Sequence, residues 1–309
     1  MVEHVSEKIE SDEDDRRMTL GEHLEELRMR LFRSAIAVAV AFSVCWAYRT
    51  PLTDLVFEPY ALAAERLNAD LDQRATEAIS LAEAETAPAP ALGEEEWREW
   101  YEEAGYPEVK TLRTDLRVPD RMKGDAASHG FIFVLKMCLF VSLFLAGPVV
   151  LWQAWMFVAA GLYRKERGVV YRHFPFSTLL FLGGVLFGYF VMVPNALYFL
   201  ARMTLTQVQY FESVGNYWSF FVTLTLALGC VFQLPVIMMA LIKIDIVAPA
   251  TFAKFRPHMV VGSLFFAALI TPPDPYTQMM MAVPVAILYE AGIWIGRLVA
   301  PKSVVDSDQ

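Results

Sequence analysis

Residues 173–200, HFPFSTLLFLGGVLFGYFVMVPNALYFL, form a long and predominantly apolar segment. The stretch contains no Asp, Glu, Lys or Arg. An α-helix rises about 1.5 Å per residue, and about 20 apolar residues are enough to cross a bilayer core. Residues 173–200 therefore predict a membrane-spanning helix.

Similar apolar blocks lie on both sides of this stretch, separated by charged segments. The chain is 56% hydrophobic and 20% charged, whereas a soluble domain has about 25% charged residues. We predict an all-α polytopic membrane protein with six transmembrane helices, at about 31–49, 131–153, 173–200, 217–242, 259–271 and 279–297. The last two are short, so we expect them to form a re-entrant hairpin or to thin the bilayer.

The N-terminal part divides into a tail and a helix. Residues 1–17 are polar and acidic, which predicts a disordered cytoplasmic tail. Residues 18–49 are expected to form an amphipathic interfacial helix followed by the first span. The leucines of the interfacial helix fall on one face at helical spacing: Leu20, Leu24, Leu27 and Leu31.

Residues 50–130 hold most of the acidity of the chain. They contain 18 acidic and 8 basic residues, while the whole chain has a net charge of −9. We expect an extended periplasmic loop with a helical insertion at 60–85 and 94–104. Because the acidity belongs to one loop and no basic patch occurs, nucleic-acid binding has no support.

Lys and Arg near the predicted helix ends indicate the orientation. They are frequent in the N-terminal segment, the second-to-third and fourth-to-fifth loops and the tail, and scarce in the third-to-fourth loop and the fifth-to-sixth turn. This bias predicts a multi-pass protein of the bacterial cytoplasmic (inner) membrane with both termini cytoplasmic. Residues 131–300 then hold spans two to six, and 301–309 form a second cytoplasmic tail.

Motifs for catalysis are missing from the sequence. There is no G-x-x-x-x-G-K-[ST], H-E-x-x-H or G-x-S-x-G pattern. The three cysteines lie in separate apolar blocks and form neither a zinc pattern nor a disulfide framework. We expect that the chain is not an enzyme and has no cofactor or metal site. The energy for any transport must then come from outside the chain, most simply from the proton gradient.

Several polar residues in apolar surroundings need an explanation. Glu26 is four residues before Arg30, which suits a surface ion pair. Gln233 falls within the fourth predicted span and needs a hydrogen-bond partner. Glu290 falls within the sixth, where a carboxylate is a functional candidate and its protonation stays open. Asp274 suits a polar turn cap.

Together these residues resemble the TatC family, the multi-span receptor subunit of the twin-arginine protein translocase. Four motifs carry the resemblance in the family's order: His23 through Arg30 (HLEELRMR), Pro148 through Phe157 running on to Glu166 and Arg167, Phe232 through Val236 (FQLPV), and Thr271 through Asp274 (TPPD) followed by Gln278. The resemblance covers residues 18–60 and 131–300. This chain departs from the family in having Gln233 where Glu is frequent, and in its longer first loop.

The resemblance implies a cup-like bundle of six helices and a set of site residues. Glu26 and Glu166 match acidic positions that contact the Arg-Arg pair of a signal peptide, and Arg28 and Phe157 match their neighbours. Pro59, Asp274 and Gln278 match positions in the periplasmic cap and outer turn. Gln233 and Glu290 are candidates for contacts with partner helices or for intramembrane polar roles.

The partners implied are the twin-arginine signal peptides of folded precursor proteins, single-span TatA-type and TatB-type subunits in a homo- or hetero-oligomer, and membrane lipids. Such a complex would export precursors using the proton gradient. The alternative is a small-solute or ion secondary transporter, with Glu290 and Gln233 lining a path. A membrane enzyme ranks last, because no nucleophile and base occur together.

Overall fold

The computed structural model describes residues 20–85, 118, 127–162, 164–204, 213–271 and 274–299. The predicted tails at 1–17 and 301–309 and the loop helix at 94–104 lie outside these residues. The described part contains four helices that are long and apolar enough to cross a membrane, or five if one bent pair counts as a span. The count of six spans therefore stays a prediction, while the all-helical, multi-pass architecture is confirmed.

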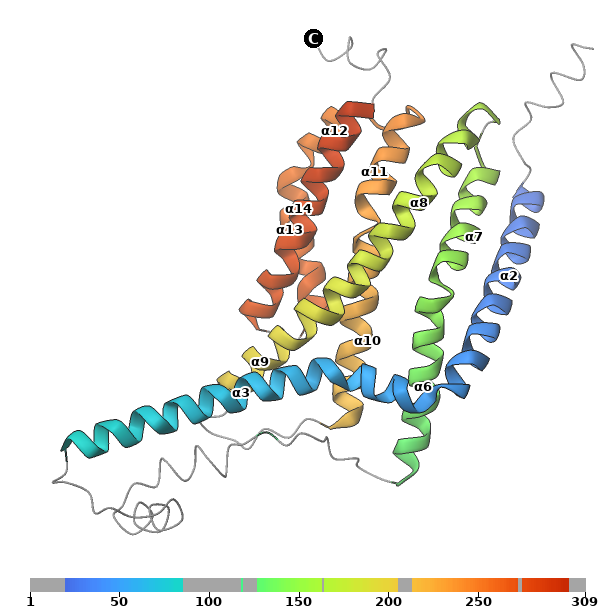
Figure 1. Cartoon of the computed structure of the whole chain (residues 1–309). Helices are drawn as coiled ribbons and strands as arrows, with labels where there is room; N and C mark the ends of the chain where they lie inside the picture. The colour runs from blue at the N-terminus through green and yellow to red at the C-terminus, as the bar shows by residue number, and fades with distance from the viewer. Residues whose placement is uncertain are drawn as a thin grey trace, which may run out of the picture. The chain divides into compact units, whose positions relative to one another are not determined.

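The chain forms two compact units, of which the first holds residues 1–53, 134–188 and 222–309. Its helices pack one upon the next: α2 (Leu20–Ala47), α7 (Gly147–Ala160), α8 (Arg164–Phe187), α11 (Leu234–Lys243), α14 (Pro275–Val299) and α13 (Arg256–Ile270). Figure 1 shows α2 at one end of this row and α13 at the other. The short α12 (Pro249–Lys254) also packs on α14.

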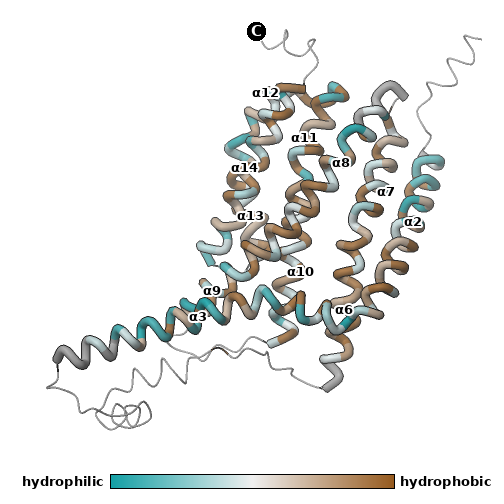
Figure 2. Tube along the Cα trace, in the orientation of Figure 1, coloured by the Kyte–Doolittle hydropathy of each residue, from teal (hydrophilic) through white to brown (hydrophobic). Residues whose placement is uncertain are grey.

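The amphipathic segment and the first span form one helix, α2, rather than two elements. No proline occurs between Leu20 and Ala47, and the only glycine is Gly21, so nothing interrupts the backbone hydrogen bonds. The next helix, α3 (Arg49–Glu85), follows after a single residue. It begins earlier than the predicted insertion helix at 60–85. Figure 2 shows the change from the hydrophobic second half of α2 to the more hydrophilic α3.

The later spans differ from their predicted form. The second apolar block is two helices, α6 (Ala127–Leu145) and α7, which meet at a bend of 57°. Pro148 in the first turn of α7 removes a backbone donor at this bend. The third block is α8, a short π-helix at Gly188–Met192 and α9 (Val193–Thr204). The fourth block breaks between α10 (Val214–Val231) and α11, where Pro235 stands.

The two C-terminal helices have unequal lengths. Helix α13 has 15 residues, which confirms that the fifth apolar helix is short. Helix α14 has 25 residues, or about 37 Å at 1.5 Å per residue. The prediction that the sixth helix is too short to span was wrong, because the helix continues beyond the most apolar stretch at both ends. Large apolar side chains on both helices face outward, as expected for contact with lipid: Phe265, Leu269 and Leu298.

The second unit holds residues 54–133 and 189–221. One face of α3 supplies much of its core, with Leu67 and Leu71 almost fully buried. The side-chain amide of Asn68 both donates to the carbonyl oxygen and accepts from the N–H of Val118, at 3.1 and 3.0 Å. This paired contact fixes one point of the long first loop on α3.

Candidate functional site

Glu26 lies on α2 beside α7 and is bound to a guanidinium. Arg30 donates from Nε to the Oε1 atom of Glu26 at 2.7 Å, and its Nη2 lies 2.5 Å from the same oxygen. The Nη1 atom of Arg30 donates to Oε1 of Gln153 on α7, at 3.1 Å. The Glu26 side chain keeps 25% of its surface exposed. The expected ion pair is therefore present, and it extends to a neighbouring helix.

One turn before this pair, a ring contact joins the same two helices. His23 of α2 stacks on Phe157 of α7 with ring centroids 4.3 Å apart and an interplanar angle of 25°. The Nδ1 atom of His23 is buried and has no hydrogen-bond partner among the described residues. The stack brings Phe157, predicted from the resemblance, to the same helix pair as Glu26.

The other two predicted signal-peptide residues are Arg28 and Glu166. Arg28 is exposed on α2, two residues from Glu26. Glu166 belongs to the first turn of α8, but its side chain lies outside the described residues. The convergence of the Glu26 and Glu166 carboxylates stays a prediction.

Gln233 stands at the break between α10 and α11 and is buried. Its Oε1 accepts a hydrogen bond from the Ser177 hydroxyl at 2.5 Å, and its Nε2 donates to the Ser177 carbonyl oxygen at 3.0 Å. Ser177 also accepts from Nε1 of Trp155 at 2.8 Å. Three helices, α7, α8 and α11, are thereby joined through one serine. The amide that needed a partner finds it within the chain.

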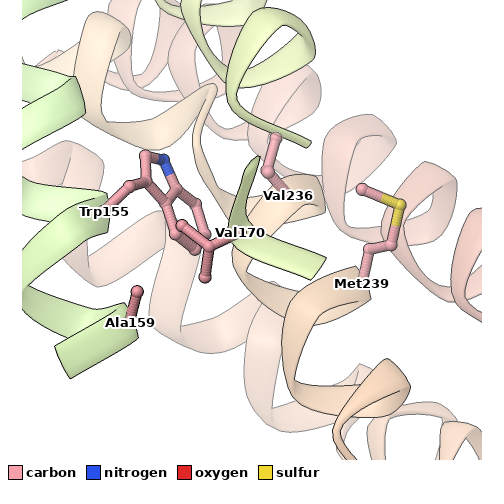
Figure 3. Close-up of a cluster of buried hydrophobic side chains, with 5 residues drawn as sticks. All are labelled: Trp155, Ala159, Val170, Val236 and Met239. Atoms are coloured by element: carbon pink, nitrogen blue, oxygen red, sulfur yellow. The ribbon is translucent and has the colours of Figure 1, made fainter. Parts of the chain in front are cut away.

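An apolar cavity of about 400 Å³ lies beside this network. Gln233 is the one amide among its lining residues. The others are apolar and come from α7, α8, α11 and the residues just after α7 and α11: Leu151, Ala154, Trp155, Val158, Leu162, Val170, Ile237, Ala240, Leu241 and Ile244. Trp155 also belongs to a buried cluster with Ala159, Val170, Val236 and Met239, drawn in Figure 3.

Glu290 on α14 is part of an ion pair with α13. Arg256 donates from Nε to Oε1 at 2.6 Å and from Nη2 to Oε2 at 2.8 Å. Both side chains keep about two fifths of their surface exposed (41% and 43%). This two-point geometry suits an ionised carboxylate. It gives Glu290 a structural partner that we did not anticipate from the sequence.

The outer-turn residues have local roles. Asp274 accepts a hydrogen bond from the Thr277 N–H at 2.7 Å, which caps the start of α14, and also contacts the Thr277 hydroxyl. Gln278 follows in the first turn, with its N–H 3.2 Å from the Asp274 carbonyl oxygen. Pro59 is buried within α3. The Tyr189 hydroxyl donates to the carbonyl oxygen of Leu55, four residues before Pro59, at 2.6 Å.

Several residues of these sites were missed from the sequence. Ser177 lies within an apolar stretch, where a single serine gives no sign of a structural role. Its role depends on the packing of three helices, which brings Trp155 and Gln233 to its hydroxyl. Arg256 could have been found, because it is the one arginine in a 15-residue apolar helix followed by a helix with one carboxylate. Nothing in the sequence links Arg30 to Gln153, which is 123 positions away.

Long apolar helices packed side by side define a multi-pass helical membrane protein. Residues 22–284 match the family described as "Sec-independent protein translocase protein (TatC)", so the chain belongs to that family. The chain is an inner-membrane subunit of the twin-arginine translocase, and the solute-transporter alternative is not favoured.

Named relatives and solved structures agree with this assignment. A "Sec-independent protein translocase protein TatC" of Azotobacter chroococcum is 32% identical over 284 residues, covering 92% of this chain and 91% of the relative. The TatC of Escherichia coli K12 is 38% identical over 178 residues, covering 58% of this chain and 69% of the relative. A crystal structure of the twin-arginine translocase receptor TatC in DDM has a TM-score of 0.63 and 27% identity, covering 89% of this chain and 99% of that one.

Proposed function

We propose that this chain binds the twin-arginine signal peptides of folded precursor proteins at the cytoplasmic face, through Glu26 and Glu166. The observation that supports this most directly is that the Glu26 carboxylate, which is one quarter exposed, already binds a guanidinium. A guanidinium is planar, stays charged at any physiological pH and can offer two parallel donors to one carboxylate. A second acid at Glu166 would receive the second arginine of the leader.

The surroundings of Glu26 suit the rest of a leader peptide. Phe157 lies in the same helix pair with one ring face stacked on His23, and a guanidinium stacks well on aromatic rings. Arg28 is exposed two residues away, at a position that the family resemblance links to signal-peptide contact. The apolar cavity beside Gln233 supports binding of the apolar part of the leader along α7, α8 and α11.

The orientation and the partners belong to the same proposal. Both termini are cytoplasmic, in keeping with the Lys and Arg at the predicted cytoplasmic ends. Single-span TatA-type and TatB-type subunits pack near Gln233 and α13, whose 15 residues would let the bilayer thin there. The proton gradient supplies the energy, since the sequence has no nucleotide-binding loop.

The test is binding of a synthetic Arg-Arg leader to the full chain in lipid nanodiscs, for the wild type and for Glu26→Gln with Glu166→Gln. Losing two charged contacts should weaken binding at least tenfold, since a hydrogen bond to a charged group contributes about 1.5–3 kcal/mol. A Lys-Lys leader serves as the control peptide. Equal affinity of the double variant and the wild type for the Arg-Arg leader would refute the proposal.

A further inference from the structure

The carboxylate proposed to receive the leader is occupied by a residue of the chain itself. Arg30 places both Nε and Nη2 within 2.7 Å of Oε1 of Glu26. The other carboxylate oxygen, Oε2, has no recorded partner among the residues that the structure describes. A leader arginine would bring the same chemical group to the same acid. A leader arginine that binds Glu26 through both oxygens must displace Arg30 from Oε1, so Arg30 and the leader compete for that oxygen.

Arg30 also has a second acceptor within reach. Its Nη1 donates to Oε1 of Gln153, a nearly buried side chain on α7. A neutral amide oxygen is a weaker acceptor for a guanidinium than a carboxylate, so the contact with Glu26 is the stronger of the two. When Arg30 is displaced from Glu26, Gln153 still holds it, and its guanidinium is not left without an acceptor.

We propose that Arg30 is an internal competitor of the signal peptide, and that it keeps its contact with Gln153 when a leader arginine takes Glu26. The inference rests on the function proposed above. Equilibrium competition raises the dissociation constant of every cationic leader by the same factor. Leaders that bind weakly then stay unbound at concentrations where a twin-arginine leader binds.

A double-mutant cycle tests this in the full chain in nanodiscs, with a fluorescent Arg-Arg leader as the probe. Arg30→Gln should lower the dissociation constant about twofold or more, the factor expected from losing an i,i+4 ion pair. The matched control is Arg33→Gln, which removes the same charge from an exposed position of α2. In a Glu26→Gln background, Arg30→Gln should have no effect beyond that of Arg33→Gln.

The outcomes separate the two claims. Weaker binding by Arg30→Gln would overturn the inference, because Arg30 would then orient Glu26 rather than compete for it. The inference would also be overturned if Arg33→Gln tightened leader binding as much as Arg30→Gln does, or if Arg30→Gln still tightened binding in the Glu26→Gln background. Either result would point to long-range charge. If Glu26→Gln weakens binding while Arg30→Gln does not strengthen it, only the inference fails. If Glu26→Gln leaves binding unchanged, the proposed function fails.

Discussion

At the scale of single residues, Ser177 carries more of the architecture than its size suggests. Its hydroxyl accepts from the Trp155 indole and donates to the Gln233 amide, while its carbonyl oxygen accepts from the same amide. All three side chains are buried. A buried polar group that loses its hydrogen-bond partner destabilises the folded protein by its full desolvation free energy, so the network depends on this one hydroxyl.

Ser177→Ala should therefore destabilise the protein by about 1–2 kcal/mol, because the Trp155 and Gln233 side chains each lose a partner in an apolar setting. The measurement is the unfolding midpoint of the detergent-solubilised chain. Ser43→Ala is the matched control, since Ser43 is exposed and bonds only to the carbonyl oxygen of Ala39. Equal midpoints for the two variants would contradict the role assigned to Ser177.

At the scale of elements, α8 and α10 approach each other closely at Gly184. A Cβ atom added to Gly184 would lie 2.7 Å from the backbone carbonyl oxygen of Leu228. A Cβ atom added to the preceding Gly183 would meet no neighbouring atom within 4 Å. Two adjacent glycines thus face different surroundings, one against a neighbouring helix and one in open space.

Gly184→Ala should lower stability by about 1–3 kcal/mol, because the backbone of α10 would have to move. Gly183→Ala should be neutral or stabilising by up to about 1 kcal/mol, since alanine favours a helix more than glycine does. Thermal unfolding of both variants checks this. A tolerated Gly184→Ala would show that the two helices can separate freely.

A second prediction concerns α3, where Pro59 lacks the N–H that would bond to the Leu55 carbonyl oxygen. The Tyr189 hydroxyl, which also lies 2.9 Å from Oε2 of Glu58, donates to that carbonyl oxygen at 2.6 Å. Tyr189→Phe should cost about 1 kcal/mol in the wild type and less in Pro59→Ala, where the new N–H bonds to Leu55 instead. Unfolding of the four proteins of this cycle gives the coupling energy. An equal loss of stability from Tyr189→Phe in the wild type and in Pro59→Ala would contradict this compensation.

At the scale of the whole molecule, the testable property is orientation. In a variant lacking Cys45, Cys138 and Cys230, a membrane-impermeant maleimide should label Glu65→Cys on intact cells, because the predicted topology places α3 on the periplasmic side. Gly168→Cys, at an exposed position early in α8, should be labelled only after permeabilisation. The reverse pattern would invert the predicted topology.

The sequence predicted most of the architecture, because apolar length and the absence of charge decide membrane insertion locally. It located the cap at Asp274, which depends on neighbours in sequence. It missed the bend before Pro148 and the length of α14. Hydropathy marks the apolar centre of a helix and not its polar ends, which explains the error on α14. The bend has a different cause, since Pro148 removes a backbone donor within an apolar block.

The candidate site was predictable only in part. Local spacing was enough for the pair of Glu26 with Arg30, whereas the contact with Gln153 joins residues 123 positions apart. Likewise the need of Gln233 for a partner followed from its surroundings, but the identity of Ser177 did not. Polar contacts between distant helices depend on rotation about each helix axis, which composition does not specify.

The ion pair of Arg256 with Glu290 bears on how an electric field acts on this protein. A single charge moved across a membrane potential of 100 mV changes in energy by about 2.3 kcal/mol. Two hydrogen bonds join the two groups, Nε to Oε1 at 2.6 Å and Nη2 to Oε2 at 2.8 Å, and the charges of the ion pair sum to zero. A uniform field exerts a torque on this dipole but no net force, so the membrane potential cannot drive α13 or α14 across the bilayer through these residues.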